Sequence, residues 1–205
     1  MLVAVWFDIG KTEETKMIRD LIIKNRSYRR FYQDAAIDRR ILEELIDLAR
    51  LSSSSANKQP LKYILSCEPE KNALIFRHLA WAGYLEDWSG PKEGERPTAY
   101  IIVLGDTQIS ESFGCDHGIA AQSILLGAVE KGFGGCIVSS VKRIELGEML
   151  NIPSHYQILF VIALGKPKEK VVIEKVGADG DIKYWRDENG VHHVPKRPLD
   201  EIIVG

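Results

Sequence analysis

Two short, largely apolar runs constrain the fold more than any other feature of the chain. Residues 100–104 end at Gly105, and residues 157–164 end at Gly165-Lys166-Pro167. A continuous apolar run of this length between turn residues is typical of a strand that is buried on both faces. We therefore expect both runs in the interior of a sheet that helices cover.

Helical periodicity occurs on either side of these strands. Apolar residues recur at steps of three and four after the N-cap candidate Asp38, which predicts an amphipathic helix over residues 38–51. Residues 113–131 place small side chains on one face, so another backbone could approach this helix closely before Gly132 ends it. Other patterns predict helices over residues 17–25, 72–88 and 142–150.

The rest of the chain reads as strands and turns. Short strands are expected over residues 61–66 and 136–138. Asn189-Gly190 is a hairpin signal before a strand over residues 191–194, and an extended tail should follow over residues 195–204. Strands mixed with helices favour an α+β fold with one domain over residues 17–205, in which residues 176–194 form a hairpin insertion.

The N-terminal segment stands apart from this pattern. Residues 1–7 are apolar, but Asp8 interrupts them and no basic stretch precedes them. We therefore expect no signal peptide. Residues 1–16 should instead form an arm, which either packs on a partner subunit or belongs to a start upstream of the fold.

Charge and cysteine content narrow the classes of function. The 205 residues carry a formal net charge of −2, so no general attraction to nucleic acid or to a membrane surface is expected. No apolar stretch is long enough to span a bilayer. The cysteines, Cys67, Cys115 and Cys136, are odd in number and widely spaced, which predicts neither a disulfide framework nor a zinc site. Reduced thiols in a cytoplasmic protein without a metal are the simplest interpretation.

Basic residues gather in one short segment, Arg26-Ser27-Tyr28-Arg29-Arg30-Phe31, at the end of the first predicted helix. Guanidinium groups stay charged and donate hydrogen bonds in pairs, which suits phosphate oxygens. The pair Lys196-Arg197 could approach the same phosphate from the C-terminal region. The segment favours a local anionic ligand, and the alternative is a solvated helix end that complements the helix dipole.

Two loops carry further polar or flexible groups. Residues 54–60, Ser-Ser-Ala-Asn-Lys-Gln-Pro, follow the helix at 38–51. Their amides both donate and accept hydrogen bonds, which suits a ligand edge of mixed character, although a polar turn would look the same. The glycines at 132, 134 and 135 close a helix and precede a strand. A dinucleotide fingerprint has the opposite order, so Rossmann-type binding is rejected.

No side chain is indicated as a nucleophile or a metal ligand. Cys136 lies in an apolar stretch, which favours a buried, inert thiol. Asp116 and His117 lie near a helix start, where capping and dipole effects are common uses. His192 and His193 alternate along a predicted strand and so point to opposite faces, where they cannot readily chelate one metal.

Together these pieces resemble the nitroreductase family of FMN-dependent NAD(P)H oxidoreductases, from about Met17 to the C-terminus. Residues 25–31 match the family's Arg-Arg-Ser-x-Arg-x-Phe segment, and residues 53–60 resemble its Pro-Ser-Ser-x-Asn-x-Gln-Pro loop. The remaining matches are the helix from Asp116 into the glycines at 132–135, Ile152-Pro153 with the strand that ends at Pro167, and the tail over residues 196–202.

The resemblance implies an α+β fold whose mixed, mainly antiparallel central sheet is flanked by helices, in an interlocked homodimer with non-covalent FMN at the subunit interface. Arg26 and Arg29 would hold the phosphate or polarise the pyrimidine edge of the flavin. The implied cofactor-binding residues are Arg26, Ser27 and Arg29, then Ser54, Ser55, Asn57 and Gln59 from the other subunit, Ser139 and Ser140 near flavin N5, and Lys196 or Arg197 at the phosphate.

The implied activity is a ping-pong transfer of hydride from NAD(P)H through flavin N5 to a nitroaromatic, quinone or similar acceptor, in which no protein side chain acts as a nucleophile. Two alternatives stay open: a flavin-binding relative with a sensing or flavin-metabolic role, and a phosphate-binding module without flavin. The chain departs from the family pattern at Asn25, which replaces the usual first arginine, and at Leu61, which replaces a frequent tryptophan.

Overall fold

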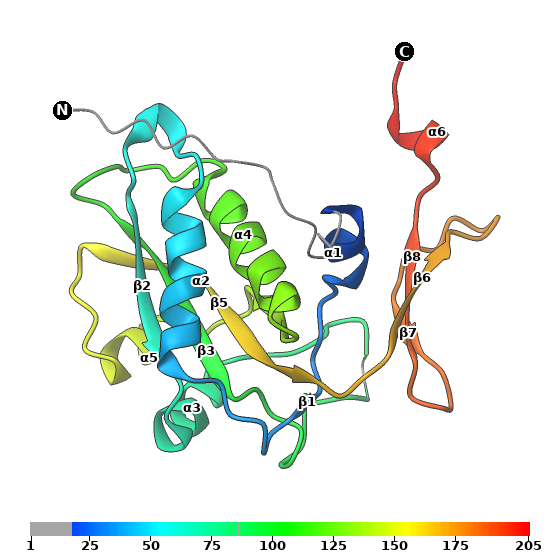
Figure 1. Ribbon diagram of the computed structural model, residues 1–205, viewed down its shortest axis with the longest axis horizontal. Helices are drawn as coiled ribbons and strands as arrows, with labels where there is room; N and C mark the ends of the chain where they lie inside the picture. Colours follow the sequence, from blue (N-terminus) through cyan, green and yellow to red (C-terminus); the bar gives the residue numbers. More distant parts are fainter. Residues whose placement is uncertain (1–17, 86) are drawn as a thin grey trace, which may run out of the picture.

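The computed structural model describes residues 18–85 and 87–205 and shows an antiparallel sheet with helices on both sides (Figure 1). The arm expected over residues 1–16 lies outside the described residues. The sheet contains β1 (Phe31–Tyr32), β2 (Leu61–Ser66), β3 (Ala99–Asp106), β4 (Gly134–Val138) and β5 (Tyr156–Pro167). Its order is β1-β5-β3-β2, and β4 also pairs with β5. The named ladders are antiparallel, and one parallel bridge joins Ser27 to Gly135, so the predicted sheet is confirmed.

Strand β3 is buried along its whole length, as its apolar run predicts. Ile101 and Val103 face one side of the sheet, where α2 (Arg39–Leu51) and α4 (Asp116–Glu130) pack. Tyr100 and Ile102 face the other side, together with residues of α3 (Pro69–Phe76) and α5 (Arg143–Met149). The sheet therefore separates two apolar cores.

The small residues on one face of α4 let this helix pack closely against α2 within the same chain. Gly127 lies against Leu45 and Leu48 of α2, and a Cβ at this glycine would come within 2.3 Å of Leu48 Cδ1. At the start of α2, Asp38 caps the helix by accepting a hydrogen bond from the backbone N–H of Arg40 at 2.7 Å. Both helices lie close to their predicted bounds.

The helix predicted over residues 72–88 is wrong. The helix there, α3, ends at Phe76, and Ala82 has a φ of +42°, which a regular helix does not allow. The chain leaves the helix because Leu79 bridges to Val141 beside β4, and because the Trp81 ring is buried in the second core. Tertiary packing of an aromatic residue thus overrides local helical periodicity.

The C-terminal region forms a separate three-stranded sheet of β6 (Val171–Lys175), β8 (His192–Lys196) and β7 (Trp185–Arg186). Strands β7 and β8 form the predicted hairpin, and Gly190 takes a φ of +75° in its turn. Strand β6 was not expected from the sequence. The extended tail expected over residues 195–204 is interrupted by the short helix α6 (Leu199–Ile202), which projects from the body near the C-terminus (Figure 1).

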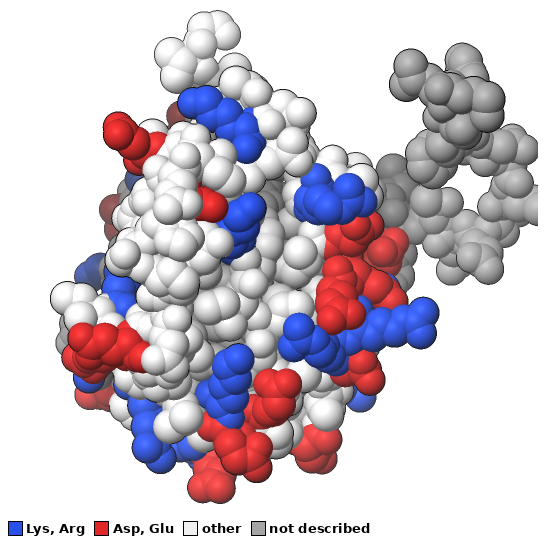
Figure 2. Space-filling model, turned by 90° about the vertical axis from the view of Figure 1, so that its left-hand side faces the viewer, with Lys and Arg blue, Asp and Glu red and all other residues white. Residues whose placement is uncertain are grey.

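The first helix, α1 (Ile18–Lys24), matches the segment predicted over residues 17–25. No helix among the described residues is both long and apolar enough to cross a membrane. On the face shown in Figure 2, acidic and basic side chains are interspersed around a broad uncharged area. That face therefore offers no continuous basic surface to a polyanion.

Gly135 tests how closely β4 packs against β5. A Cβ at this position would lie 2.6 Å from the backbone oxygen of Ala163, which cannot move without disturbing the ladder. We expect Gly135→Ala to lower the free energy of unfolding by about 1–3 kcal/mol in urea titrations. Gly147 in α5 has open space at its Cβ, so Gly147→Ala should instead add about 0.4–1 kcal/mol. Equal stability of the two variants would contradict this packing.

Candidate functional site

The backbone of the segment between α1 and β1 is held in place by strand β4 and by one buried carboxylate. The N–H of Tyr28 donates to the carbonyl of Gly135 at 3.0 Å, which lays the segment along β4. The carboxylate of Glu169 accepts hydrogen bonds from the backbone N–H groups of Arg29 and Arg30. Its other oxygen accepts from Arg186 Nη2 at 3.0 Å, and the side chain has no exposed surface. Sequence reasoning missed this buried carboxylate.

The arginines of the segment diverge. Arg26 and Arg29 line a cavity of about 320 Å³, while Arg30 forms two hydrogen bonds of 2.7 Å to the Glu95 carboxylate. The hydrogen bonds from Arg30, helped by Lys168, hold the pKa of Glu95 down at about 2, against the cost of partial burial. Arg30 is therefore a structural residue, and Arg26 and Arg29 are the arginines of this segment that line the cavity.

The cavity that Arg26 and Arg29 line draws on several elements. Its wall includes Ser27, Gln122 of α4, and Gly135 and Ile137 of β4. Residues of the C-terminal sheet region complete it, namely Tyr184, His192, Val194 and Lys196. Lys196 thus lines the same cavity as Arg26 and Arg29, whereas Arg197 pairs with Glu201 on the surface at 3.2 Å. None of the described residues that line the cavity is acidic.

Arg29 is fixed from two sides. Its guanidinium carbon lies 4.8 Å from the centre of the Tyr184 ring, and Nη1 lies 3.3 Å from His192 Nε2. His192 is 1% exposed, and burial, with the positive charge of Arg29 second, lowers its pKa to about 4. A neutral imidazole accepts at Nε2 from the arginine, which leaves the proton on Nδ1. Neither Tyr184 nor His192 was predicted as a site residue.

The two adjacent histidines point to opposite faces, as their alternation along the strand predicts. His193 contacts the carboxylates of Glu174 and Asp187 and stacks on Trp185, so it stiffens the C-terminal sheet. Within residues 18–85 and 87–205, no group of His, Cys, Asp and Glu side chains could hold a metal ion. Cys136 is buried, and burial raises the pKa of its thiol, which fits the inert role expected for it.

The serine loop lies elsewhere on the chain. Asp116, at the start of α4, accepts hydrogen bonds from the Ser54 hydroxyl and, at 2.9 Å, from the Ser55 backbone N–H. Asn57 and Gln59 have φ values of +53° and +54°, and Gln59 Nε2 donates to Asn57 Oδ1 at 3.1 Å. The buried Asp116 therefore holds a strained loop in one shape, a role that its helix-start position alone did not reveal.

Ser54 and Gln59 line a second cavity of about 310 Å³, together with Tyr63, Asp116 and Ala120. Within one chain the structure does not bring this loop together with the arginines, since the two cavities share no residue. Between them lies a shallow depression on α4 that includes Ile119 and Gln122. The exposed face of α4 thus separates the two groups of predicted site residues.

Ser139 and Ser140 follow the end of β4 and line neither cavity. Their carbonyl groups are engaged, since Ser139 accepts from Arg143 Nη2 at 3.1 Å and Ser140 from the backbone N–H of Ala80 at 2.9 Å. Asn25, which departs from the family pattern, donates to Gln122 Oε1 at 3.4 Å. The side chain of Asn25 therefore lines the cavity as a neutral group.

Comparisons with known proteins agree on one family. The model of the nitroreductase family matches residues 22–166. A putative NADH dehydrogenase/NAD(P)H nitroreductase of Archaeoglobus fulgidus is 27% identical over 73% of this chain and 85% of its own length.

Two solved structures share the fold. A nitroreductase family protein of Streptococcus pneumoniae superposes with a TM-score of 0.66 and 18% identity, over 91% of this chain and 98% of its own. An FMN-dependent nitroreductase of Clostridium difficile superposes with a TM-score of 0.60 and 22% identity, over 73% of this chain and 87% of its own. Because the family model covers most of the sequence, this chain belongs to the nitroreductase family.

Proposed function

We propose that the protein is a homodimeric, FMN-dependent oxidoreductase that uses NAD(P)H to reduce a nitroaromatic, quinone or similar acceptor. The observation that carries the proposal is the cavity into which Arg26, Ser27, Arg29 and Lys196 converge without an acidic residue in its described lining. Such a set of donors suits a ligand that is anionic and rich in acceptors. The names of the Archaeoglobus and Clostridium proteins support the same activity and the same cofactor.

The residues of the cavity fit FMN. Arg26 has a buried Nε without a partner among the described residues, so a guanidinium donor is left over for a ligand. Gly135 and Ile137 of β4 form an apolar part of the lining beside Ser27, against which a flat ring could lie. In this proposal Arg26 and Lys196 hold the phosphate, and Ser27 and Arg29 bind the ribityl chain and the pyrimidine edge.

Bound FMN would supply the hydride chemistry, and the protein would supply binding and electrostatics. Arg29 would place a positive charge beside the pyrimidine edge, where it would favour the reduced, more negative flavin. Tyr184 and the neutral His192 hold that guanidinium in position, so little reorganisation is needed when the charge develops. No side chain need act as a nucleophile in this scheme.

A second copy of the chain would complete the site. The serine loop and the arginines lie on different sides of the exposed face of α4, so one chain offers only part of the predicted donors to either cavity. Exposed apolar side chains suited to an interface are present on α1, α4 and α6, namely Ile18, Ile22, Ile23, Ile119, Leu199 and Ile202. We propose that Ser54, Ser55, Asn57 and Gln59 reach the flavin that the partner's arginines hold.

A visible absorption spectrum of the purified protein tests the function. We expect flavin bands, after reconstitution with FMN if needed, that bleach on anaerobic addition of NADH or NADPH and return with a nitroaromatic or quinone acceptor. Bands that persist with both nucleotides would contradict the reductase activity and would favour a flavin-binding relative that senses or metabolises flavin. A protein that stays colourless after FMN is added would contradict flavin binding and would favour a phosphate-binding module.

Arg29→Ala tests the assignment of the cofactor site. Loss of a charged donor to FMN should weaken flavin binding by about 10- to 100-fold, measured by fluorescence titration of the apoprotein. The matched control is Arg40→Ala, whose side chain is 86% exposed on α2 and faces neither cavity. Equal flavin affinity in the Arg29→Ala variant and the wild type would remove Arg29 from the cofactor site.

Asp116→Ala tests the serine loop. The substitution leaves the Ser55 N–H and the Ser54 hydroxyl without their acceptor, which should lower the free energy of unfolding by about 1–3 kcal/mol and weaken FMN binding. The matched control is Asp47→Ala, because the Asp47 carboxylate pairs with Arg50 on the surface. This variant should change the free energy of unfolding by less than about 1 kcal/mol. If FMN binds the Asp116→Ala variant as tightly as the wild type, the loop does not contribute to the site.

A further inference from the structure

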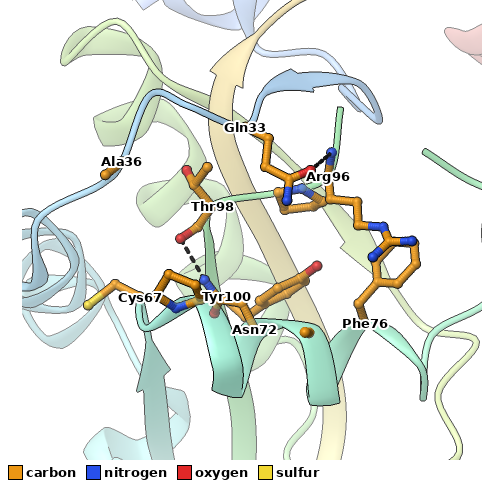
Figure 3. Close-up of a pocket in the computed structure, with 11 residues that line it drawn as sticks. Gln33, Ala36, Cys67, Asn72, Phe76, Arg96, Thr98 and Tyr100 are labelled. Carbon is orange, nitrogen blue, oxygen red and sulfur yellow. Dashed lines mark hydrogen bonds between the residues drawn. The ribbon is translucent and has the colours of Figure 1, made fainter. Parts of the chain in front are cut away.

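A third cavity lies at a different place in the fold, between α3, the start of β3 and the loop after β1 (Figure 3). It has a volume of about 120 Å³ and shares no lining residue with the two cavities described above. Nothing in the proposed flavin chemistry uses it. Its lining nevertheless contains two buried polar groups that the protein leaves unpaired.

The first unpaired group is the hydroxyl of Tyr100. The residue is 0% exposed, and its hydroxyl has no hydrogen-bond partner among the described residues. Burial raises the pKa of the phenol, although the nearby charge of Arg96 opposes the rise, so the hydroxyl stays protonated and can donate. A buried hydroxyl without a partner is costly, because it has lost its hydrogen bonds to water.

The second unpaired group is Nε of Arg96, which is buried without a partner in the described part of the chain. The guanidinium lies 4.5 Å from the centre of the Phe76 ring, which holds it beside the cavity. Figure 3 shows the Tyr100 hydroxyl on the side of its ring that faces Arg96. A neutral donor and a permanent cation therefore border the same small space.

The side-chain oxygens of Gln33 and Asn72, which also line the wall, are already used as acceptors. Gln33 Oε1 already accepts from the backbone N–H groups of Gly94 and Arg96, at 2.8 and 3.1 Å, so this side chain can offer only its amide nitrogen. Asn72 is satisfied at both ends, since it accepts from the Ser66 hydroxyl and donates to the Thr98 carbonyl, each at 2.8 Å. The Tyr100 hydroxyl and the Arg96 guanidinium are therefore the unpaired donors of the wall, and they suit a ligand that accepts hydrogen bonds and carries negative charge.

Much of the remaining wall is apolar. Ala36, Ala73 and Pro97 line it together with the Phe76 ring, so the space does not suit a fully hydrated inorganic ion. Its volume is somewhat below that of an engineered protein cavity of about 150 Å³ that binds benzene. A ligand that fits has a single anionic head and a body of a few carbon atoms.

We propose that this cavity is a binding site for a small monocarboxylate. The carboxylate would accept hydrogen bonds from the Tyr100 hydroxyl and the Arg96 guanidinium, and its short carbon chain would lie against Ala73 and Pro97. The site is independent of the flavin cavity, because the two share no residue. Its occupation therefore does not depend on the function proposed above.

Calorimetric titration of the purified full-length protein with butyrate tests this site. We expect saturable binding in the millimolar range, with no comparable binding of butylammonium, which has the same body and the opposite charge. Tyr100→Phe removes only the hydroxyl and should weaken butyrate binding at least about tenfold, because a hydrogen bond to a charged group is lost. Arg96→Gln should weaken it further, whereas the exposed Arg77→Gln on the same side of the fold should bind as the wild type does.

Protein stability separates loss of the ligand contact from loss of the fold. Without butyrate, Tyr100→Phe should be at least as stable as the wild type, because it removes an unpaired hydroxyl from the core. With butyrate, the wild type should gain in melting temperature and the Tyr100→Phe variant should gain little. Absence of saturable binding, equal affinity of the two proteins, or equal affinity for inorganic phosphate would each overturn the monocarboxylate site.

Discussion

The carboxylate of Glu169 is the contact on which the arrangement of the cavity depends. The carboxylate is fully buried between the arginine segment, the end of β5 and the hairpin of β7 and β8. It accepts hydrogen bonds from two backbone N–H groups of the arginine segment and from the guanidinium of Arg186 in β7. A buried carboxylate needs such partners, because its desolvation is otherwise unfavourable. The same requirement ties the C-terminal sheet to the arginine segment, so that Tyr184 and His192 meet Arg29.

The electrostatics of the site follow from how the cations are divided. Arg30 and Lys168 are matched by Glu95, and Arg186 by Glu169, so their charges are used within the fold. Arg29 contacts a neutral imidazole, an aromatic face and the Ser27 carbonyl oxygen, and it forms no ion pair with a described residue. The described lining of the cavity thus keeps an uncompensated positive charge, while the protein as a whole is slightly acidic. The candidate anion site therefore depends on which cations are paired within the fold, and the net charge of the protein does not reveal it.

Much of the fold could be predicted from the sequence, because its signals are local. The runs that became β3 and β5, the capped helix after Asp38 and the Asn189-Gly190 turn all depend on periodicity or turn chemistry. The error at residues 72–88 arose where the Trp81 ring enters the core and breaks a helical pattern. The arginine segment was predicted, but Glu169, Tyr184 and His192 were not, because their roles depend on contacts between residues far apart in sequence.

The division of the predicted site residues between two cavities has a physical consequence. Helix α4 keeps Asp116 at its first turn, beside the serine loop, and Gln122 two turns later, beside the arginines. A helix rises about 1.5 Å per residue and is stiff, so α4 keeps the serine loop and the arginines at separate places along its axis. In the dimer proposed above, a second chain laid against the exposed face of α4 would place its serine loop over the arginines. Assembly and cofactor binding are therefore expected to be one coupled equilibrium, in which each stabilises the other.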